Sequence, residues 1–534
     1  MSVALLLATI IGSLLITMLT HRWRVHSGII TLLLAAALSF LPLHQHIEVE
    51  PHIILGIVMP PLLYSAALSF SISTFFKNIR PIIGMGVVLV LVTCAVVTWL
   101  APMIDPTISL AGAFVLAAVV APPDAVTMVS EERTEGIPRT VTSVIKGESI
   151  VNDATALVLF SVAIATFTHQ QNFIKNPFLF FGYSSIVGIL IGLVTGFLVI
   201  LTRRRIGNPT IEVALNIVVP FAIYQISEFV HASGVLGVIT AGFLISTMTT
   251  LDGRMTSQTA YKTRLIETRV WPIIELLIES FLFAYIGFQL HSSIEAVGEA
   301  TGHLVDNALF ALVITVLVIA IRFIYVYVLF SAIKGRNQLI EKHLENYNNR
   351  KQDNSTEVYR GRKARKMKDG YPTEPAFNLK ECFLVSWMGM RGIVTLAAAA
   401  SIPVAGLGAE RTKEVAIIQF TAFTVASVTL IFQGLTLPLV VKALNLDLTA
   451  DQQEKQKDRD IISDSVKHLE INPRQAKLTD KNFDDARSRI TQYMIHTDLT
   501  EEATRAAIDR IDLQQAAWES RAKTYTALEE SLDE

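Results

Sequence analysis

Residues 147–153 carry two carboxylates, a hydroxyl and a carboxamide at the start of an apolar stretch long enough to cross a bilayer. On a helix, Ser149 and Asp153 would be stacked, because they are four residues apart. Glu148 and Asn152 have the same spacing and form an adjacent pair. Oxygen atoms gathered on one stripe suit a hard cation, and a carboxylate among them can bind a proton instead. The pattern predicts a site at which a monovalent cation and a proton compete.

The composition indicates that these polar groups lie inside a membrane. The chain has 534 residues, of which 51% are hydrophobic and only 17% are charged. Runs of about twenty apolar residues recur, and each could span roughly 30 Å of hydrocarbon. A charged side chain in hydrocarbon is costly, so an ionisable residue there usually marks an ion or proton pathway. The formal net charge of −2 says little about partners, because the charges lie almost entirely in loops and the tail.

Several classes of protein are disfavoured by what the sequence lacks. Cys94 and Cys382 lie in or beside apolar runs, without metal-site spacing, and are expected to be small packing residues. The sequence contains no phosphate-binding Gly-x-x-x-x-Gly-Lys-Ser/Thr loop, which argues against a nucleotide-driven pump. We therefore expect a protein that is not an enzyme, uses no cofactor and binds no nucleic acid.

The apolar runs predict about thirteen membrane spans. The first has no basic residue before it, so it is interpreted as a transmembrane helix and not as a cleaved signal peptide. The predicted spans are residues 3–20, 28–43, 52–70, 81–101, 107–129, 140–168, 178–202, 209–230, 233–250, 270–290, 304–333, 379–402 and 412–443.

Lysine and arginine are concentrated in alternate loops. The basic loops contain Arg22 and Arg24, Lys77 and Arg80, Arg133 and Arg139, Arg203 to Arg205, residues 254–269 and residues 334–378. The opposite loops carry almost none, apart from Lys175, Arg411 and Lys413. Because basic loops stay in the cytoplasm, the pattern predicts a plasma-membrane protein with its amino terminus outside and its carboxyl terminus in the cytoplasm.

The predicted organisation is a transmembrane domain, residues 1–443, followed by a cytoplasmic tail, residues 444–534. The basic loop at 334–378 is either a solvated cytoplasmic segment or one attracted to anionic lipid headgroups. In the tail, the stretch 484–530 has few glycines or prolines and is expected to be helical, but its apolar spacing is irregular for a coiled coil. A role in regulation or assembly and a helical appendage of unknown role both remain open.

Two of the predicted spans contain breaks. In span five, Pro122 and Pro123 remove backbone donors, and Asp124 follows at once. A broken helix at membrane depth is tolerated only where its backbone is buried in protein or lines a cavity. The freed carbonyl of Pro123 could then coordinate a cation beside the Asp124 carboxylate. A simple proline kink is the alternative.

Span twelve contains the second break, where Arg391 is flanked by Gly389 and Gly392 inside an apolar run. Spans five and twelve are seven apart, so they occupy corresponding positions if spans one to six and eight to thirteen are two halves. An offset of seven reverses each span, which makes the repeats inverted. The sequence therefore predicts an all-α polytopic membrane protein with two inverted repeats of six helices and discontinuous helices at positions five and twelve.

Arg322 is a further charge inside an apolar run and needs a partner. Glu148 is the candidate, since it has no other evident task, and the pair would hold the architecture without taking part in transport. Small residues at 188, 192 and 196 form a stripe that close helix packing explains, although the stripe does not reveal which helix it faces.

Taken together, these motifs resemble the sodium/proton exchangers, and more narrowly the bacterial electroneutral cation:proton antiporters. The resemblance covers roughly residues 1–443 in matching order. The residues that carry it are Gly147-Glu148-Ser149, Asn152-Asp153, Pro60-Pro61, the aspartate of span five, Phe281-Leu282-Phe283 and Gly389-Met390-Arg391-Gly392.

The resemblance implies a role for each of these positions. Asp153 would be the carrier of cation and proton, and a neutral residue at Asn152 implies one cation per proton. Ser149 and the span-five break would coordinate the cation, while Glu148 and Arg322 would form a structural pair. Members of the family are homodimers in which a core domain moves against a dimerisation domain, so alternating access and a role in pH and cation homeostasis are implied as well.

One departure from the family pattern leaves the transported cation open. Many bacterial members have Thr-Asp-Pro at the span-five break, whereas this sequence has Pro123-Asp124-Ala125. The threonine hydroxyl is missing, so Na⁺, K⁺ and Li⁺ all remain candidates, and a K⁺-selective antiporter is the first alternative. A cation channel or a membrane sensor acting through the tail is a more distant one, because no repeated filter motif is present.

Overall fold

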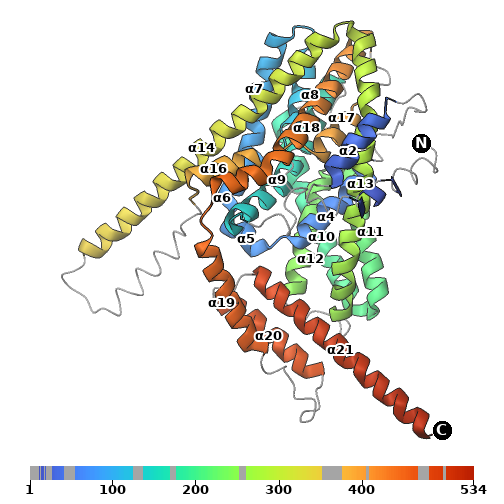
Figure 1. Ribbon diagram of the computed structural model, residues 1–534, viewed down its shortest axis with the longest axis vertical. Coiled ribbons are helices and arrows are strands. Elements are labelled where there is room, and N and C mark those ends of the chain that lie inside the picture. Colours follow the sequence, from blue (N-terminus) through green and yellow to red (C-terminus); the bar gives the residue numbers. More distant parts are fainter. Residues whose placement is uncertain are drawn as a thin grey trace.

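The computed structural model describes residues 11–12, 14–16, 18–19, 27–40, 54–123, 136–168, 176–251, 260–350, 376–403, 408–466, 480–496 and 501–533. Over these residues the protein is all helical and contains no strand, as predicted (Figure 1). Seven helices are long and apolar enough to cross a membrane, and four shorter apolar helices accompany them. The predicted span 3–20 lies largely outside the described residues, as does the end of the predicted span 107–129, from residue 124 on.

The helices of the transmembrane domain pack in two groups. The α9 group comprises α6 (Ile79–Ile83), the π-helical turn η2 (Gly84–Leu89), α7 (Val90–Ile104), α8 (Leu110–Val120), α9 (Arg139–Phe167), α14 (Leu304–Arg350), α16 (Leu379–Trp387), α17 (Ile393–Ala400) and α18 (Ala409–Leu444). The α12 group comprises α2 (Ser27–Leu38), the π-helical turn η1 (Ile54–Val58), α4 (Met59–Ser69), α10 (Pro177–Ile206), α11 (Pro209–Phe229), α12 (Gly234–Leu251) and α13 (Ala260–Thr301). A short helix, α5 (Ile72–Lys77), links them, and the groups also touch where α13 meets α18.

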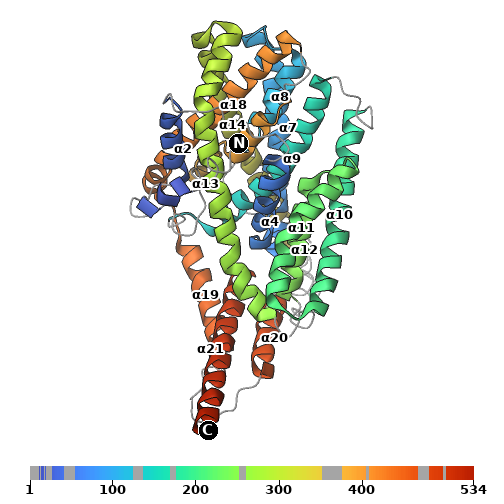
Figure 2. The same cartoon turned by 90° about the vertical axis from the view of Figure 1, so that its right-hand side faces the viewer.

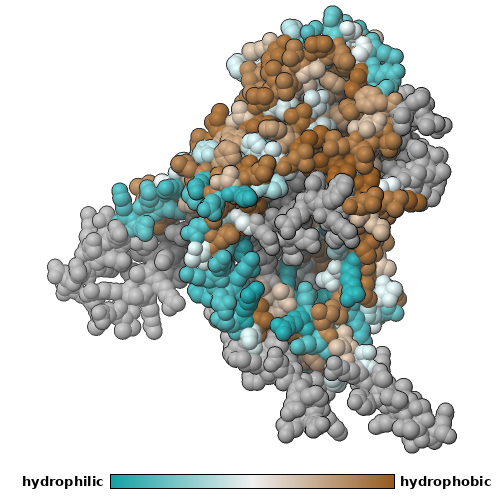
Figure 3. All heavy atoms as spheres, viewed as in Figure 1, coloured by the Kyte–Doolittle hydropathy of each residue, from teal (hydrophilic) through white to brown (hydrophobic). Residues whose placement is uncertain are grey.

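The outer surface of this domain is apolar where lipid would surround it. Figure 3 shows an extended apolar face over the upper part of the molecule and a more hydrophilic surface toward the tail helices below. Large apolar side chains that are exposed on α10 include Leu179, Ile186, Leu190, Val194 and Phe197. Burial of these side chains against lipid tails replaces the burial in protein that a water-soluble helix would need.

The stripe of glycines on α10 faces α12. A Cβ atom added to Gly192 would lie 2.3 Å from the Gly237 carbonyl oxygen, and one added to Gly188 would lie 2.5 Å from that of Ser233. Both separations are too short for real atoms, so only glycine lets the two backbones approach this closely. Figure 2 shows α10, α11 and α12 side by side at one edge of the molecule. The stripe therefore serves packing within one chain.

Two helices run further than the hydropathy pattern predicted. Helix α13 begins at Ala260, ten residues before the predicted span, and α14 continues to Arg350 through the first part of the predicted loop 334–378. The extension after residue 333 contains no proline and is rich in residues that favour helices, so nothing ends the helix where it leaves the apolar region. Hydropathy locates the apolar part of a helix and not its ends.

Both predicted breaks have described helix ends. The predicted span 379–402 consists of α16 and α17, separated by residues 388–392. The predicted span 107–129 begins with α8, which ends at Val120, and Pro122 and Pro123 are not helical. The Pro-Pro pair and the glycines flanking Arg391 thus coincide with the ends of regular helix.

The tail folds into three helices, α19 (Thr449–Val466), α20 (Asp480–His496) and α21 (Glu501–Asp533) (Figure 1). Helices α20 and α21 share an apolar cluster of their own, to which Ile462 of α19 and Trp518 of α21 add partly buried side chains. The cluster contains Phe483, Ala486, Ile490, Ala503, Ala507 and Ile511. A helical tail was expected, but its packing as a small bundle was not.

Candidate ion-binding site

Helix α9 is surrounded by protein, and it carries the polar residues that the sequence pointed to. Of its most apolar window, 78% is buried, against 22% for α10. Ser149, Asn152 and Asp153 are 1%, 0% and 7% exposed. Their side chains therefore lie within the domain and do not face lipid.

The structure brings Asn152 to the break after α8. The Asn152 Nδ2 atom donates a hydrogen bond to the Pro123 carbonyl oxygen at 2.5 Å. Pro123 lies beyond the end of α8 and is not helical, and its carbonyl accepts from a side-chain donor. The carboxamide thus ties the middle of α9 to the end of the broken helix. Asp124 lies outside the described residues.

Two side-chain oxygen atoms on the same turn of α9 have no hydrogen-bond donor among the described residues. Within the part of the chain that the structure describes, Ser149 Oγ and Asn152 Oδ1 are buried and have no hydrogen-bond partner. A buried oxygen without a donor costs roughly 1–3 kcal/mol. Other buried oxygens of the described residues, Ser227 Oγ of α11 among them, share this state, but Ser149 and Asn152 lie beside a buried carboxylate. Together with the Asp153 carboxylate, they form a set of oxygen ligands of the kind that a monovalent cation prefers.

Glu148 and Arg322 form a buried ion pair across α9 and α14, and each side chain is 1% exposed. Arg322 Nη1 and Nη2 donate to the two carboxylate oxygens, the second at 3.0 Å. Arg322 Nη2 also donates to the Val385 carbonyl at 3.0 Å, near the carboxyl end of α16. A Cβ atom added to Gly389 would overlap the guanidinium, which explains a glycine at that position.

Arg391 makes the corresponding contact with the other broken helix. Its Nε atom donates to the Val120 carbonyl at 2.8 Å, at the carboxyl end of α8, and its Nη1 atom donates to the Gly389 carbonyl at 3.1 Å. The carboxyl end of a helix carries a partial negative charge, so a guanidinium there is stabilising. Each half-helix thus ends on an arginine, and the two breaks are joined beside α9.

A second buried network in the α12 group was missed. Arg203 of α10 is 8% exposed and pairs with Glu267 of α13 at 3.1 Å and with Glu212 of α11 at 3.9 Å. Asn216 donates to Glu267 at 3.0 Å and accepts a hydrogen bond from the Tyr64 hydroxyl. We counted Arg203 as a loop charge, which is wrong, because α10 continues to Ile206. The sequence offered one signal for this network, which is that an arginine and two glutamates lie near the ends of three different helices.

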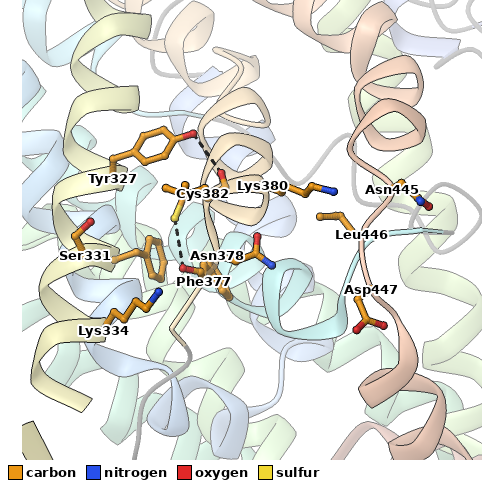
Figure 4. Close-up of a pocket in the computed structure, with 12 residues that line it drawn as sticks. Tyr327, Ser331, Lys334, Phe377, Asn378, Lys380, Cys382, Asn445, Leu446 and Asp447 are labelled. Atoms are coloured by element: carbon orange, nitrogen blue, oxygen red, sulfur yellow. Dashed lines mark hydrogen bonds between the residues drawn. The ribbon is translucent and has the colours of Figure 1, made fainter. Parts of the chain in front are cut away.

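A pocket also lies elsewhere, between α14, α16 and the residues that follow α18 (Figure 4). Its volume is about 670 Å³. Tyr327 donates to the Leu379 carbonyl at 3.2 Å on one side of it, and Lys380 Nζ donates to the Leu444 carbonyl at 2.9 Å on another. None of the predicted ion-site residues lines this pocket, so it is separate from the site on α9.

Comparison with known proteins identifies the family. A family model described as sodium/hydrogen exchanger, transmembrane, matches residues 6–443. The chain belongs to the sodium/hydrogen exchanger family. The exchanger is 29% identical, over 443 residues, to an uncharacterized Na(+)/H(+) exchanger of Mycobacterium tuberculosis, covering 82% of this chain and 73% of the relative.

Two further comparisons extend the result. The exchanger is 26% identical over 425 residues to the sodium, potassium, lithium and rubidium/H(+) antiporter of Bacillus pumilus, covering 78% of this chain and 57% of that protein. The solved structure of the sodium proton antiporter MjNhaP1 from Methanocaldococcus jannaschii at pH 8 has the same fold. It aligns with a TM-score of 0.58 and 16% identity, over 83% of the exchanger and 99% of MjNhaP1.

Proposed function

We propose that the exchanger moves one monovalent cation against one proton by alternating access around Asp153. Family membership supports cation:proton antiport. The observation that carries the assignment to this site is the pair of buried oxygens, Ser149 Oγ and Asn152 Oδ1, on the same turn as the Asp153 carboxylate. A cation offers both of them the positive partner that the described protein does not.

In this proposal Asp153 alternates between two loads. Deprotonated, it holds the cation with Ser149 and the Asn152 carbonyl oxygen, and backbone oxygen at the Pro123 break and the Asp124 carboxylate complete the shell. Protonation removes the negative charge and displaces the cation. Only the cation-bound or protonated state changes its access from one side of the membrane to the other, because a bare Asp153 carboxylate is costly to move through a desolvated environment.

The side chain of Asn152 supports an electroneutral exchange. Its carboxamide does not ionise, so residue 152 contributes a dipole and no charge, and its Nδ2 atom is held by the Pro123 carbonyl. The site then has one carboxylate on α9 that titrates with transport, and a proton replaces a monovalent cation without net charge movement. Glu148 is already balanced by Arg322 and takes no part.

The same proposal includes the transported cation, the cytoplasmic location of the tail and the oligomeric state. The name of the Bacillus pumilus relative includes four alkali cations, which supports Na⁺ without excluding K⁺ or Li⁺ here. The basic ends of α10 and α13 lie at the same end of the domain as the tail, as Lys262 and Arg264 contact α21. This arrangement supports a cytoplasmic tail in the plasma membrane, and the family resemblance supports a homodimer.

Proteoliposomes with an internal pH dye, and with the voltage clamped by an ionophore, test the proposal. Gradients of Na⁺, K⁺ or Li⁺ should each be applied to the wild type and to Asp153→Asn. We expect a cation-driven pH change that ignores voltage and is absent from the folded mutant. Retained exchange in Asp153→Asn would refute the carrier assignment, and a voltage-dependent rate would refute the one-to-one stoichiometry.

A further inference from the structure

The tail lies outside residues 6–443, the part of the chain that matches the family model. It nevertheless contacts both helix groups of the transmembrane domain. Helix α19 reaches the α9 group at Arg139, the first residue of α9. Asp451 accepts a hydrogen bond from the Arg139 backbone N–H at 2.6 Å, and Asp458 pairs with its guanidinium at 3.4 Å. The helix that carries Asp153 is therefore held at its amino end by the tail.

Helix α21 reaches the α12 group through Arg505. Arg505 Nη1 donates to the Leu68 carbonyl at 2.7 Å, and Nη2 donates to the Phe70 carbonyl at 3.2 Å. Nη2 also lies 2.8 Å from Ser246 Oγ, on α12. One guanidinium thus binds carbonyls at the carboxyl end of α4, where the partial charge of the helix is negative, and joins α4 to α12.

Oppositely charged pairs continue the contact along α13. Arg264 donates to both carboxylate oxygens of Asp512, at 2.7 and 2.9 Å, and Asp512 is fully buried. Lys262 pairs with Glu519 at 2.7 Å. A bidentate pair between arginine and a carboxylate fixes the orientation of the two groups as well as their distance. The position of α21 against α13 is therefore well defined.

The two contacts are linked through the apolar cluster of the tail. Ile462 of α19 packs against the cluster that Phe483 of α20 and Ile511 of α21 help to form. Docked in this way, α21 also provides one wall of a cavity of about 360 Å³, whose other walls are on α4, α12 and α13. The bundle therefore connects the two helix groups and closes one side of the space between three helices.

We propose that the tail bundle is a strap that restrains the α9 group against the α12 group and slows exchange while it is docked. This inference rests on the proposed function, since alternating access requires the two groups to move relative to one another. Two of its ion pairs, Arg139 with Asp458 and Lys262 with Glu519, are partly exposed, so they weaken as salt screens the charges. Release of the whole bundle, α19 included, frees Arg139 and α9 for the movement that carries Asp153.

Arg505→Ala in the full-length chain tests the strap, with Arg510→Ala as the matched control. Arg510 lies on the same helix, is exposed, and makes no hydrogen bond or ion pair with the described residues. Hydrogen bonds to a charged group are worth enough to shift the ratio of docked to released tail by roughly tenfold. We expect Arg505→Ala to exchange several times faster than the wild type in the dye assay and to expose α21 to protease, while Arg510→Ala matches the wild type in both.

A second pair of variants tests the strap even if Arg505→Ala does not fold. Lys262→Glu should speed exchange, and adding Glu519→Lys should restore both the wild-type rate and the protection of α21, because the pair is re-formed with its charges exchanged. Rates for Arg505→Ala equal to or below those of Arg510→Ala would overturn the strap. A wild type without any cation-driven pH change would instead overturn the proposed function, so the two failures can be told apart.

Discussion

Asn152 and Asn216 are both fully buried asparagines on membrane helices, yet their side chains are used differently. Asn216 is satisfied at both ends, since it donates to Glu267 and accepts from Tyr64. Asn152 donates to Pro123, and its oxygen has no hydrogen-bond partner in the described ranges. Asn216 thus has partners for both its amide and its carbonyl group, whereas Asn152 has an acceptor to which the described protein donates no hydrogen bond. We therefore interpret Asn216 as structural and the unpartnered acceptor of Asn152 as part of the proposed cation site.

The largest effect should come from breaking the ion pairs that frame the two regions. Arg322→Met leaves Glu148 buried without a partner, which should destabilise the protein by about 3–5 kcal/mol. Arg203→Met should have a comparable cost, because Glu212 and Glu267 lose their shared cation. Thermal unfolding in detergent would measure both. The protein of Arg203→Met that remains folded should keep the wild-type KM for the cation, and a raised KM would show that the two regions are not separate.

Replacing each asparagine by alanine compares the two side chains directly. Both changes remove a buried hydrogen bond, so both should lower stability by roughly 1–3 kcal/mol. Only Asn152→Ala should also reduce exchange more than tenfold, because it frees the Pro123 carbonyl and removes a cation ligand. Initial rates in proteoliposomes, scaled to folded protein, would separate the effects. Equal loss of exchange in Asn216→Ala would contradict the comparison.

Ser149 and Ser227 allow a finer test, since in the described chain both hydroxyls are buried without a hydrogen-bond partner. Ser149→Ala should raise the KM for the cation several-fold, about the effect of losing 1 kcal/mol of binding. It should leave stability unchanged or slightly higher, as no hydrogen bond is lost. Ser227→Ala, on α11 in the other group, should alter neither. A KM for Ser149→Ala equal to that of the wild type would remove Ser149 from the ligand set.

The smallest effect should be on the pH dependence of the tail contact. Burial raises the pKa of Asp509 on α21, nearby Asp512 raises it further, and Arg264 and Arg505 oppose the shift. Glu267 and Glu275 line the same cavity. A raised pKa means that the charged form disfavours docking; the penalty is full above that pKa and is relieved as the pH falls through it.

Asp509→Asn should therefore keep the tail docked at higher pH. We expect exchange about twofold slower than in the wild type above the raised pKa and equal to it below, since a factor of two is the modest size expected of one partly screened charge. Rates measured across a pH series, with protease protection of α21 at each point, would check this. A variant that undocks more readily than the wild type at high pH would show that the sign is wrong.

The parts of the fold that sequence could predict are those set by local chemistry. Apolar runs located the spans, and the Pro-Pro and Gly-Arg-Gly signals located the breaks, because each acts within a few residues. The pairing of Glu148 with Arg322 was also predictable, since two buried charges had few alternatives. The Arg203 network was not, because it depends on where α10 and α13 end. Nor was the contact of Arg505 with Leu68 and Phe70, which joins backbone atoms more than 400 residues away along the chain.

The length of α14 has a mechanical consequence. The helix has 47 residues, which corresponds to about 70 Å, and it leaves the body of the protein as a single rod (Figure 1). Arg322 is fixed at the crossing of the broken helices, and roughly 40 Å of helix lies beyond it. Each degree of tilt about Arg322 thus moves the far tip by about 0.7 Å, so a fluorophore near Arg350 would report small rotations of α14 about the buried Glu148–Arg322 pair.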